Sequence, residues 1–134
     1  MSESIGIESL DFLYTPSRDV AADVADHTDV LGCRLAFAIE EGGIRVAMVE
    51  LSSGPPAILM TDHLIGDRPI LVYRVADLPH AVAELARRGW QPDRSLEIPP
   101  GPCAAFRSPG GHRFAVYELV RPGVIEHFQG RRDF

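Results

Sequence analysis

The order of apolar and polar positions in the first half of the chain predicts a strand, a helix and three further strands. Residues 7–15 have strand character, and residues 19–32 carry apolar side chains at helical spacing between a capping Asp19 and a terminating glycine. Two apolar runs within residues 33–51 meet at Glu41-Gly42-Gly43, a hairpin signal, and residues 55–61 form one more short run. The first half is therefore predicted to be βαβββ.

The second half repeats this order. Residues 69–75 are predicted to form a strand, and residues 77–89 a helix that begins at Asp77 and ends at Gly89. Two stretches follow, a proline-rich one at 95–108 and an apolar one at 112–120. A second βαβββ run is the simplest interpretation of this half.

A comparison of the two halves tests for an internal repeat. An offset of 58 places Asp19 over Asp77, and after one deletion an offset of 57 places residues 55–62 over residues 112–119. The alternative is that βαβββ arises in any mixed domain and that the capping residues agree by chance. The single coherent shift favours duplication.

Composition narrows the class of protein. The chain has 134 residues, of which 46% are hydrophobic and 24% charged, and it has no apolar run long enough for a bilayer, which is typical of one soluble domain. Its first residues lack the basic and apolar regions of a secretory signal, so a cytoplasmic location is expected. Cys33 and Cys103 are far apart and are expected to be buried thiols. A net charge of -6 without a basic cluster disfavours nucleic acid as a partner.

Three stretches carry a family resemblance: "LDFLYTPSRD", "ILVYRVADLPHAVAELARRGW" and "SPGGHRFAVYEL". In order and spacing they resemble the first strand and helix cap, the second strand–helix pair and the final turn and strand of the vicinal oxygen chelate superfamily. This superfamily includes glyoxalases, bleomycin-resistance proteins and extradiol dioxygenases. The resemblance implies an α+β fold in which two βαβββ modules form an eight-stranded open barrel around a cleft, with the helices outside. We expect a single domain over residues 1–134, with modules at about 5–62 and 68–121 and a C-terminal tail at 122–134.

The resemblance also places the metal-ligand positions of the family on four residues of this chain. These positions hold Phe12, Ile58, Ile70 and Ala115. None of these side chains has an oxygen or nitrogen atom that could bind a divalent ion. No metal and no cofactor are therefore expected, and nucleophile-elbow, Walker and dinucleotide-binding motifs are absent from the sequence.

Strand alternation from these four positions predicts a largely apolar ligand-binding face. Its expected members are Phe12, Tyr14, Ile58, Met60, Ile70, Arg74, Arg113, Ala115 and Tyr117. The side chains of opposite parity are expected to pack beneath the helices; they are Leu13, Leu59, Leu71, Val75, Phe114 and Val116. The alternative is that the apolar members only fill the barrel and bind nothing. By the same rule Glu118 should point away from the cleft, and His112 is expected to be a solvated turn residue.

Two functions are compatible with these features. The first is a metal-independent protein of the bleomycin-resistance type, conferring antibiotic resistance by sequestering an apolar or aromatic drug or natural product. The second is a lyase, isomerase or dioxygenase of the glyoxalase, epimerase or dioxygenase type, which would need a displaced metal or metal-free proton transfer by Asp62, His63, Glu50 or Tyr117. The first function requires no reactive group, so binding without chemistry is the primary hypothesis and catalytic residues are not assigned.

The C-terminal tail carries more apolar side chains than a solvated terminus needs, namely Val124, Ile125, Phe128 and Phe134. Exposed sheet edges are usually covered or paired. We expect the tail to pack across a partner subunit or over the cleft mouth, and the resemblance implies a homodimer.

Overall fold

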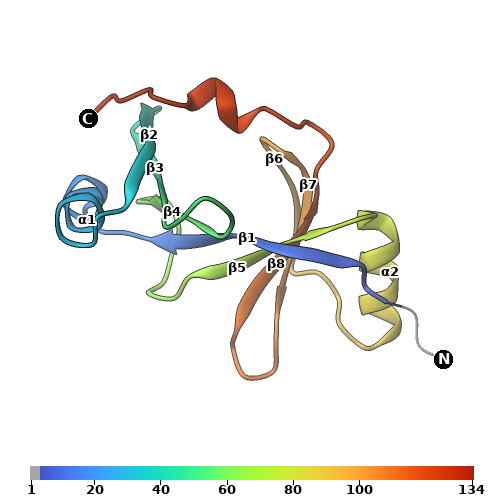
Figure 1. Cartoon of the computed structure of the whole chain (residues 1–134). Helices are drawn as coiled ribbons and strands as arrows, with labels where there is room; N and C mark the ends of the chain where they lie inside the picture. The colour runs from blue at the N-terminus through green and yellow to red at the C-terminus, as the bar shows by residue number, and fades with distance from the viewer. Residues whose placement is uncertain (1–3) are drawn as a thin grey trace. The chain divides into compact units, whose positions relative to one another are not determined.

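The computed structural model describes residues 4–134, which form eight strands and two α-helices with two short helical turns (Figure 1). In chain order the elements are β1 Ile7–Pro16, α1 Val20–Ala25, a π-helical turn Asp26–Val30, β2 Arg34–Glu41, β3 Ile44–Glu50, β4 Ala57–Thr61, β5 Ile70–Val75, α2 Leu78–Arg87, β6 Arg94–Ile98, β7 Gly101–Arg107, β8 Arg113–Glu118 and a 3-10 turn Ile125–Phe128. Both predicted βαβββ runs and the α+β class are confirmed. Neither helix in the described part of the chain has the length and apolar character that a bilayer crossing requires.

The first predicted helix is shorter than expected as an α-helix. It begins behind Asp19, whose side chain accepts a hydrogen bond from the Ala22 N–H at 3.0 Å. From Asp26 the backbone widens into the π-helical turn, in which the Leu31 N–H donates to the Asp26 carbonyl at 3.1 Å. The segment ends at Gly32, where φ is +74°, a conformation that favours glycine.

The second predicted helix is confirmed and has two acidic side chains at its N-terminus. Asp77 accepts a hydrogen bond from the His80 N–H at 3.0 Å, and the Glu118 carboxylate accepts one from the Leu78 N–H at 2.7 Å. These bonds satisfy N–H groups that have no partner within the helix. Glu118 therefore points toward α2, as its parity predicted.

The strands form a mixed sheet in the order β2-β3-β4-β1-β5-β8-β7-β6. The chain divides into two compact units, the first comprising the described residues through Asp11 with Ile70–Ile125, and the second Phe12–Pro69 with Glu126–Phe134. Strand β1 thus contributes to both units. Each unit is described by itself below.

In the first unit, β5 and β8 are parallel, and β7 is antiparallel to both β8 and β6. Helix α2 packs on this sheet, and the core between them is apolar. Its buried members are Val75, Leu78, Ala81, Leu85, Ala104, Phe106 and Val116. Phe114 and Trp90 pack against this cluster, with 5.2 Å between their ring centroids. The prediction that Val75, Phe114 and Val116 lie beneath the helix is confirmed.

In the second unit, the later part of β1 is parallel to β4, β4 is antiparallel to β3, and β3 is antiparallel to β2. The predicted hairpin between β2 and β3 turns at Gly42 and Gly43, whose φ angles are +59° and +78°. Helix α1 covers the core of this unit. Its buried members are Val20, Val24, Ala38, Ala47, Val49 and Met60.

The register of β4 corrects one prediction. Leu13 of β1 pairs with Ile58 of β4, and the equivalent Leu71 of β5 pairs with Phe114 of β8. The last strands of the two repeats, β4 and β8, are therefore related by an offset of 56 residues rather than the predicted 57. A one-residue slip turns every side chain of a strand to the other face. Ile58 and Met60 consequently face the α1 core, and Leu59 occupies the face on which Ile58 was expected.

The tail pairs with β2 of its own chain, a contact that the sequence did not predict. The Gly130 N–H donates to the Ala36 carbonyl at 2.8 Å, and Ala38 exchanges two further main-chain hydrogen bonds with the tail. The Phe128 ring lies 5.6 Å from that of Phe37, and Phe134 packs against the α1 core. The unpaired edge of β2 provides the reason, since a free strand edge offers N–H and C=O groups to any extended segment nearby.

Candidate functional site

The first unit contains a cluster of charged side chains on the β5 and β8 face that points away from α2. We call it the Asp11 cluster; its members are Glu8, Asp11, Arg74 and Tyr117. Arg74 Nε lies 3.3 Å from Glu8 Oε1 and 3.8 Å from Asp11 Oδ2. The Tyr117 hydroxyl donates a hydrogen bond to the same Asp11 oxygen. Ser9 Oγ donates to the other oxygen of Asp11 at 2.5 Å, so this carboxylate is held from two sides.

Burial makes the Asp11 cluster chemically distinctive. Tyr117 is 2% exposed and the Asp11 side chain 11%. Burial raises the pKa of Tyr117, and the hydrogen bond to Asp11 raises it further, because ionising the phenol would place two negative charges together. Tyr117 is therefore a hydrogen-bond donor rather than a base, which argues against its predicted role in accepting a proton.

Arg74 has an unused donor in this cluster. Although both carboxylates are near, its buried Nε–H makes no hydrogen bond of good geometry to any residue within 4–134. Most buried polar groups in proteins are hydrogen-bonded, so such an exception needs an explanation. An acceptor atom on a bound molecule would satisfy it.

The remaining predicted site residues of this unit surround the cluster in different ways. Ala115 is buried and lies on the same face as Tyr117, two residues away along β8. Ile70 and Arg113 are half-buried at the beginnings of β5 and β8. His112 precedes β8 in an exposed turn, where its N–H bonds to Ser108 Oγ at 3.1 Å, in agreement with its predicted turn position.

The second unit contains a separate polar set, Tyr14, Thr61 and His63. The Tyr14 hydroxyl lies 3.0 Å from His63 Nε2, and Thr61 Oγ1 lies 2.6 Å from His63 Nδ1. Both ring nitrogens of His63 are thus engaged, one with each hydroxyl. Burial raises the pKa of Tyr14, partly opposed by a hydrogen bond from Thr61. The arrangement can pass a proton between a phenol, an imidazole and a hydroxyl.

Phe12 and Tyr14 lie on the face of the second unit that was predicted for them. Tyr14 pairs with Leu59 and Phe12 with Ala57, and residues paired across a sheet share a face. Ile58 and Met60, predicted to lie beside them, are on the opposite face and belong to the α1 core. Leu59 therefore shares the face of Phe12 and Tyr14 in their place.

A displaced metal would have to be held by Asp62, His63 or Glu50, and these residues do not form a metal-binding group. Asp62 accepts a hydrogen bond from the Arg45 N–H at 3.1 Å, and Glu50 is paired with Arg34 at 2.5 Å, which lowers the pKa of Glu50. Within residues 4–134 no group of three histidine, cysteine or acidic side chains could hold a metal ion. The corrected register places Leu59, another hydrocarbon, at the position expected of Ile58. The side chains at the positions that the resemblance matched to metal ligands do not fit a metal.

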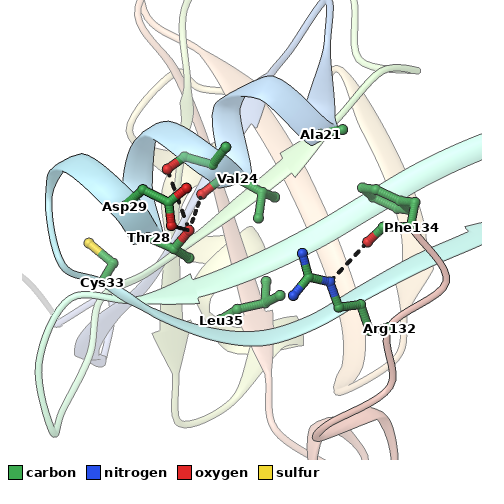
Figure 2. A pocket seen from close by; sticks show the side chains of 9 residues that line it. Ala21, Val24, Thr28, Asp29, Cys33, Leu35, Arg132 and Phe134 are labelled. Carbon is green, nitrogen blue, oxygen red and sulfur yellow. Dashed lines mark hydrogen bonds between the residues drawn. The ribbon is translucent and has the colours of Figure 1, made fainter.

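A cavity of about 370 Å³ lies elsewhere in the second unit, and sequence reasoning did not find it. Figure 2 shows it between α1 with its π-helical turn, the beginning of β2 and the C-terminal tail. Its lining residues are Ala21, Val24, Ala25, Thr28, Asp29, Cys33, Leu35, Arg132 and Phe134. The tail forms one wall, so the cavity depends on a pairing between segments that are far apart in the sequence.

Sequence reasoning also missed Asp11, Glu8 and Thr61. Along a regular strand Asp11 alternates with Phe12, so it was not expected on the predicted ligand face. Its contact with Tyr117 shows that it reaches the same face as Arg74 and Tyr117. The clustering of acidic side chains in β1 beside a strand that contains an arginine was the available signal.

Comparison with solved structures defines the class of fold. Methylmalonyl-CoA epimerase from Mycobacterium tuberculosis is 18% identical, with a TM-score of 0.71 over 90% of this chain and 93% of that one. A Streptomyces coelicolor methylmalonyl-CoA epimerase variant in complex with 2-nitronate-propionyl-CoA is 14% identical, with a TM-score of 0.70 over 87% and 97% of the two chains. A hypothetical protein from Bacillus halodurans is 15% identical, with a TM-score of 0.68 over 82% and 93%.

These similarities establish that the chain has the vicinal oxygen chelate fold. The resemblance read from the sequence is thereby confirmed at the level of the fold. No protein-family model matches the sequence, and no curated protein matches it. Identities of this size carry no assignment of ligand or reaction.

Proposed function

We propose that this protein binds a small, largely apolar or aromatic molecule on the β5 and β8 face of the first unit and uses no metal to do so. The buried, unused Nε–H of Arg74 is the observation that carries the proposal. It lies beside a buried phenol and next to small and apolar side chains such as Ala115, and small-molecule sites usually combine apolar walls with a few placed polar groups. Sequestration of a drug or natural product requires no more than this.

The charges of the Asp11 cluster restrict the ligand further. Two carboxylates, those of Glu8 and Asp11, face one guanidinium, that of Arg74, so the cluster carries a net negative charge when ionised. An anionic ligand would meet repulsion there. The ligand that fits is a neutral or cationic planar molecule with a carbonyl oxygen to accept the Arg74 Nε–H.

The substitution Arg74→Lys tests this proposal directly. Lysine keeps a positive charge between Glu8 and Asp11 but has no Nε–H, so the fold should be retained while the ligand's hydrogen bond is lost. Daunorubicin, a planar quinone with one amine, is a suitable fluorescent probe. Its affinity should fall about tenfold, as expected for one lost hydrogen bond to a charged group.

Arg107→Lys is the matched control, because Arg107 is an exposed arginine of the same unit. It should leave daunorubicin binding unchanged. Equal affinity of the two lysine variants for the probe, or no probe binding by the unaltered protein, would contradict the proposed site.

Independence from metal is tested on the unaltered protein. Protein purified without added metal should contain no stoichiometric nickel, zinc, iron or manganese, and EDTA should leave its melting temperature unchanged. The expectation rests on the hydrocarbon side chains at Phe12, Leu59, Ile70 and Ala115. About one bound transition metal per chain would overturn it.

A second candidate function is metal-free proton transfer in the second unit. It is supported by the 3.0 Å contact between the Tyr14 hydroxyl and His63 Nε2, which couples a phenol to an exposed imidazole. Several proteins with the same fold are named methylmalonyl-CoA epimerases. An epimerase must exchange a proton at the inverted carbon, and a tyrosine–histidine pair can donate and accept one.

Deuterium exchange separates this function from binding alone. Incubation with methylmalonyl-CoA in heavy water, followed by NMR, should show protein-dependent exchange that His63→Gln abolishes and His112→Gln preserves. His112 is the control because it lies in an exposed turn before β8. No exchange above the uncatalysed rate, or equal exchange by the two variants, would exclude this function for that substrate.

A further inference from the structure

The cavity beside the C-terminal tail is separate from the residues assigned above, and at its rim are an exposed cation and an exposed anion that form no ion pair with any residue in 4–134. Arg132 Nε donates to the Phe134 carbonyl at 3.2 Å, and Asp29 Oδ1 accepts from Thr28 Oγ1 at 3.3 Å. Within residues 4–134 neither the Arg132 guanidinium nor the Asp29 carboxylate forms an ion pair. Figure 2 shows Asp29 on the helical wall and Arg132 on the tail.

Apolar side chains lie between these two charges. Val24 of α1 and Leu35 of β2 line the cavity, with the Phe134 ring on the side of the tail (Figure 2). Thr28 and Asp29 belong to the π-helical turn, a type of irregularity that frequently occurs at functional sites. A volume of about 370 Å³ lies within the range of small-molecule sites.

We propose that this cavity binds a small zwitterion with an apolar body, such as an apolar amino acid or a short peptide of such residues. The planar guanidinium of Arg132 matches a carboxylate, the Asp29 carboxylate matches an ammonium group, and Val24 and Leu35 contact the apolar body. A simple carboxylate would leave Asp29 facing a second anion. A simple amine would offer no carboxylate to the Arg132 guanidinium.

Calorimetric titration with L-leucine and L-leucyl-L-leucine tests the charge requirement, because these probes carry the same two charges at different separations. At least one of them should bind in a saturable way. Isocaproate and isoamylamine, which each lack one charge, should bind about tenfold more weakly, since each lacks one charge-assisted contact. Isocaproate or isoamylamine binding as tightly as the zwitterion would overturn the proposal.

Substitutions locate the binding. Arg132→Gln and Asp29→Asn should each weaken the zwitterion about tenfold, while the exposed controls Arg107→Gln and Asp67→Asn should leave it unchanged. Ala21→Phe should block the cavity from its exposed rim. If all these variants bind equally, or if neither zwitterion binds the unaltered protein, the cavity is not such a site.

Cys33 provides an independent readout, because its half-buried thiol lines the cavity. A bound zwitterion should slow the alkylation of Cys33 by iodoacetamide in proportion to occupancy. Burial raises the pKa of the other thiol, Cys103, to about 11, so that residue should react slowly with or without the probe. Unchanged alkylation of Cys33 at saturating zwitterion would contradict binding in this cavity.

Discussion

Removal of one oxygen atom by Tyr117→Phe should destabilise the first unit without leaving a cavity in it. The Tyr117 hydroxyl donates to Asp11 Oδ2, and both side chains are largely withdrawn from solvent. The substitution keeps the ring and its packing. It leaves the largely buried Asp11 carboxylate with one hydrogen bond fewer.

The magnitude follows from the charge of the acceptor. A hydrogen bond to a charged group contributes about 1.5–3 kcal/mol, roughly twice the value for a neutral pair. Because Tyr117 is only 2% exposed, solvent screening should reduce the contribution of this hydrogen bond only slightly. We therefore expect the free energy of unfolding to fall by about 2 kcal/mol.

Urea denaturation followed by tryptophan fluorescence measures this loss. Trp90 is the single tryptophan and packs against the core of the same unit, so its emission reports unfolding there. Tyr73→Phe is the matched control: Tyr73 is half-buried on β5, and its hydroxyl makes no hydrogen bond to any residue in 4–134. That variant should change the unfolding free energy by less than about 0.5 kcal/mol.

The pH dependence gives the same contact a second signature. Burial and then the bond to Asp11 raise the pKa of Tyr117 above its ordinary value of 10.0, so the folded state retains a proton that the unfolded state loses. The associated stability is fully present below pH 10 and is lost as pH rises toward the folded pKa, at about 1.4 kcal/mol per pH unit. The chain contains no lysine, but burial also raises the pKa of Tyr14 and of Cys103, so the contribution of Tyr117 is the difference in alkaline loss between the unaltered protein and Tyr117→Phe.

Two results would refute this reasoning. One is a Tyr117→Phe variant as stable as Tyr73→Phe at neutral pH. The other is an equal loss from Tyr117→Phe in the Asp11→Asn background, because a double-mutant cycle with no coupling would mean that the hydroxyl does not interact with this carboxylate. The alkaline loss should also be smaller in Tyr117→Phe than in the unaltered protein.

Three further predictions concern other contacts. Glu118→Ala should lower the unfolding free energy by about 1 kcal/mol in urea denaturation, because the Leu78 N–H loses its cap; an unchanged midpoint would contradict this. Phe134→Ala should lower the unfolding free energy by about 2 kcal/mol in the same assay, since the Phe134 ring packs on the α1 core and its centroid lies 4.5 Å from the Arg45 guanidinium carbon. A smaller loss than that caused by Ile65→Ala, a substitution at an exposed residue, would show that the tail contributes little to stability. Sedimentation at micromolar concentration should give a homodimer of about twice the 14.7 kDa chain mass, and a monomer would refute that expectation.

Local chemistry made much of the fold predictable. Asp19 and Asp77 mark helix starts because their side chains satisfy N–H groups that the helix leaves free. The paired glycines at 42 and 43 mark a hairpin because their positive φ angles suit few other residues. Such signals act over a few residues, so the order βαβββ-βαβββ could be deduced from the chain alone.

The register of β4 was not predictable to the residue, although the existence of the strand was. The apolar run around Ile58, Leu59 and Met60 has no polar alternation, so its pattern does not say which side chains face α1. The pairing of Leu13 with Ile58 shows which side chains of β4 face α1. It moves Ile58 and Met60 from the predicted ligand face to the α1 core. An error of one position in a repeat alignment has this effect because side chains alternate along a strand.

The sequence by itself determined the elements, their order and the core beneath α2, since each depends on residue type and local spacing. Only the tertiary structure decided that Asp11 reaches Tyr117, that His63 contacts Tyr14, and that the tail encloses a cavity against α1. Asp11 and Tyr117 are 106 residues apart, and Tyr14 and His63 are 49 apart. Contacts across such separations depend on strand register and on which sheet edge remains unpaired, and no local pattern encodes either.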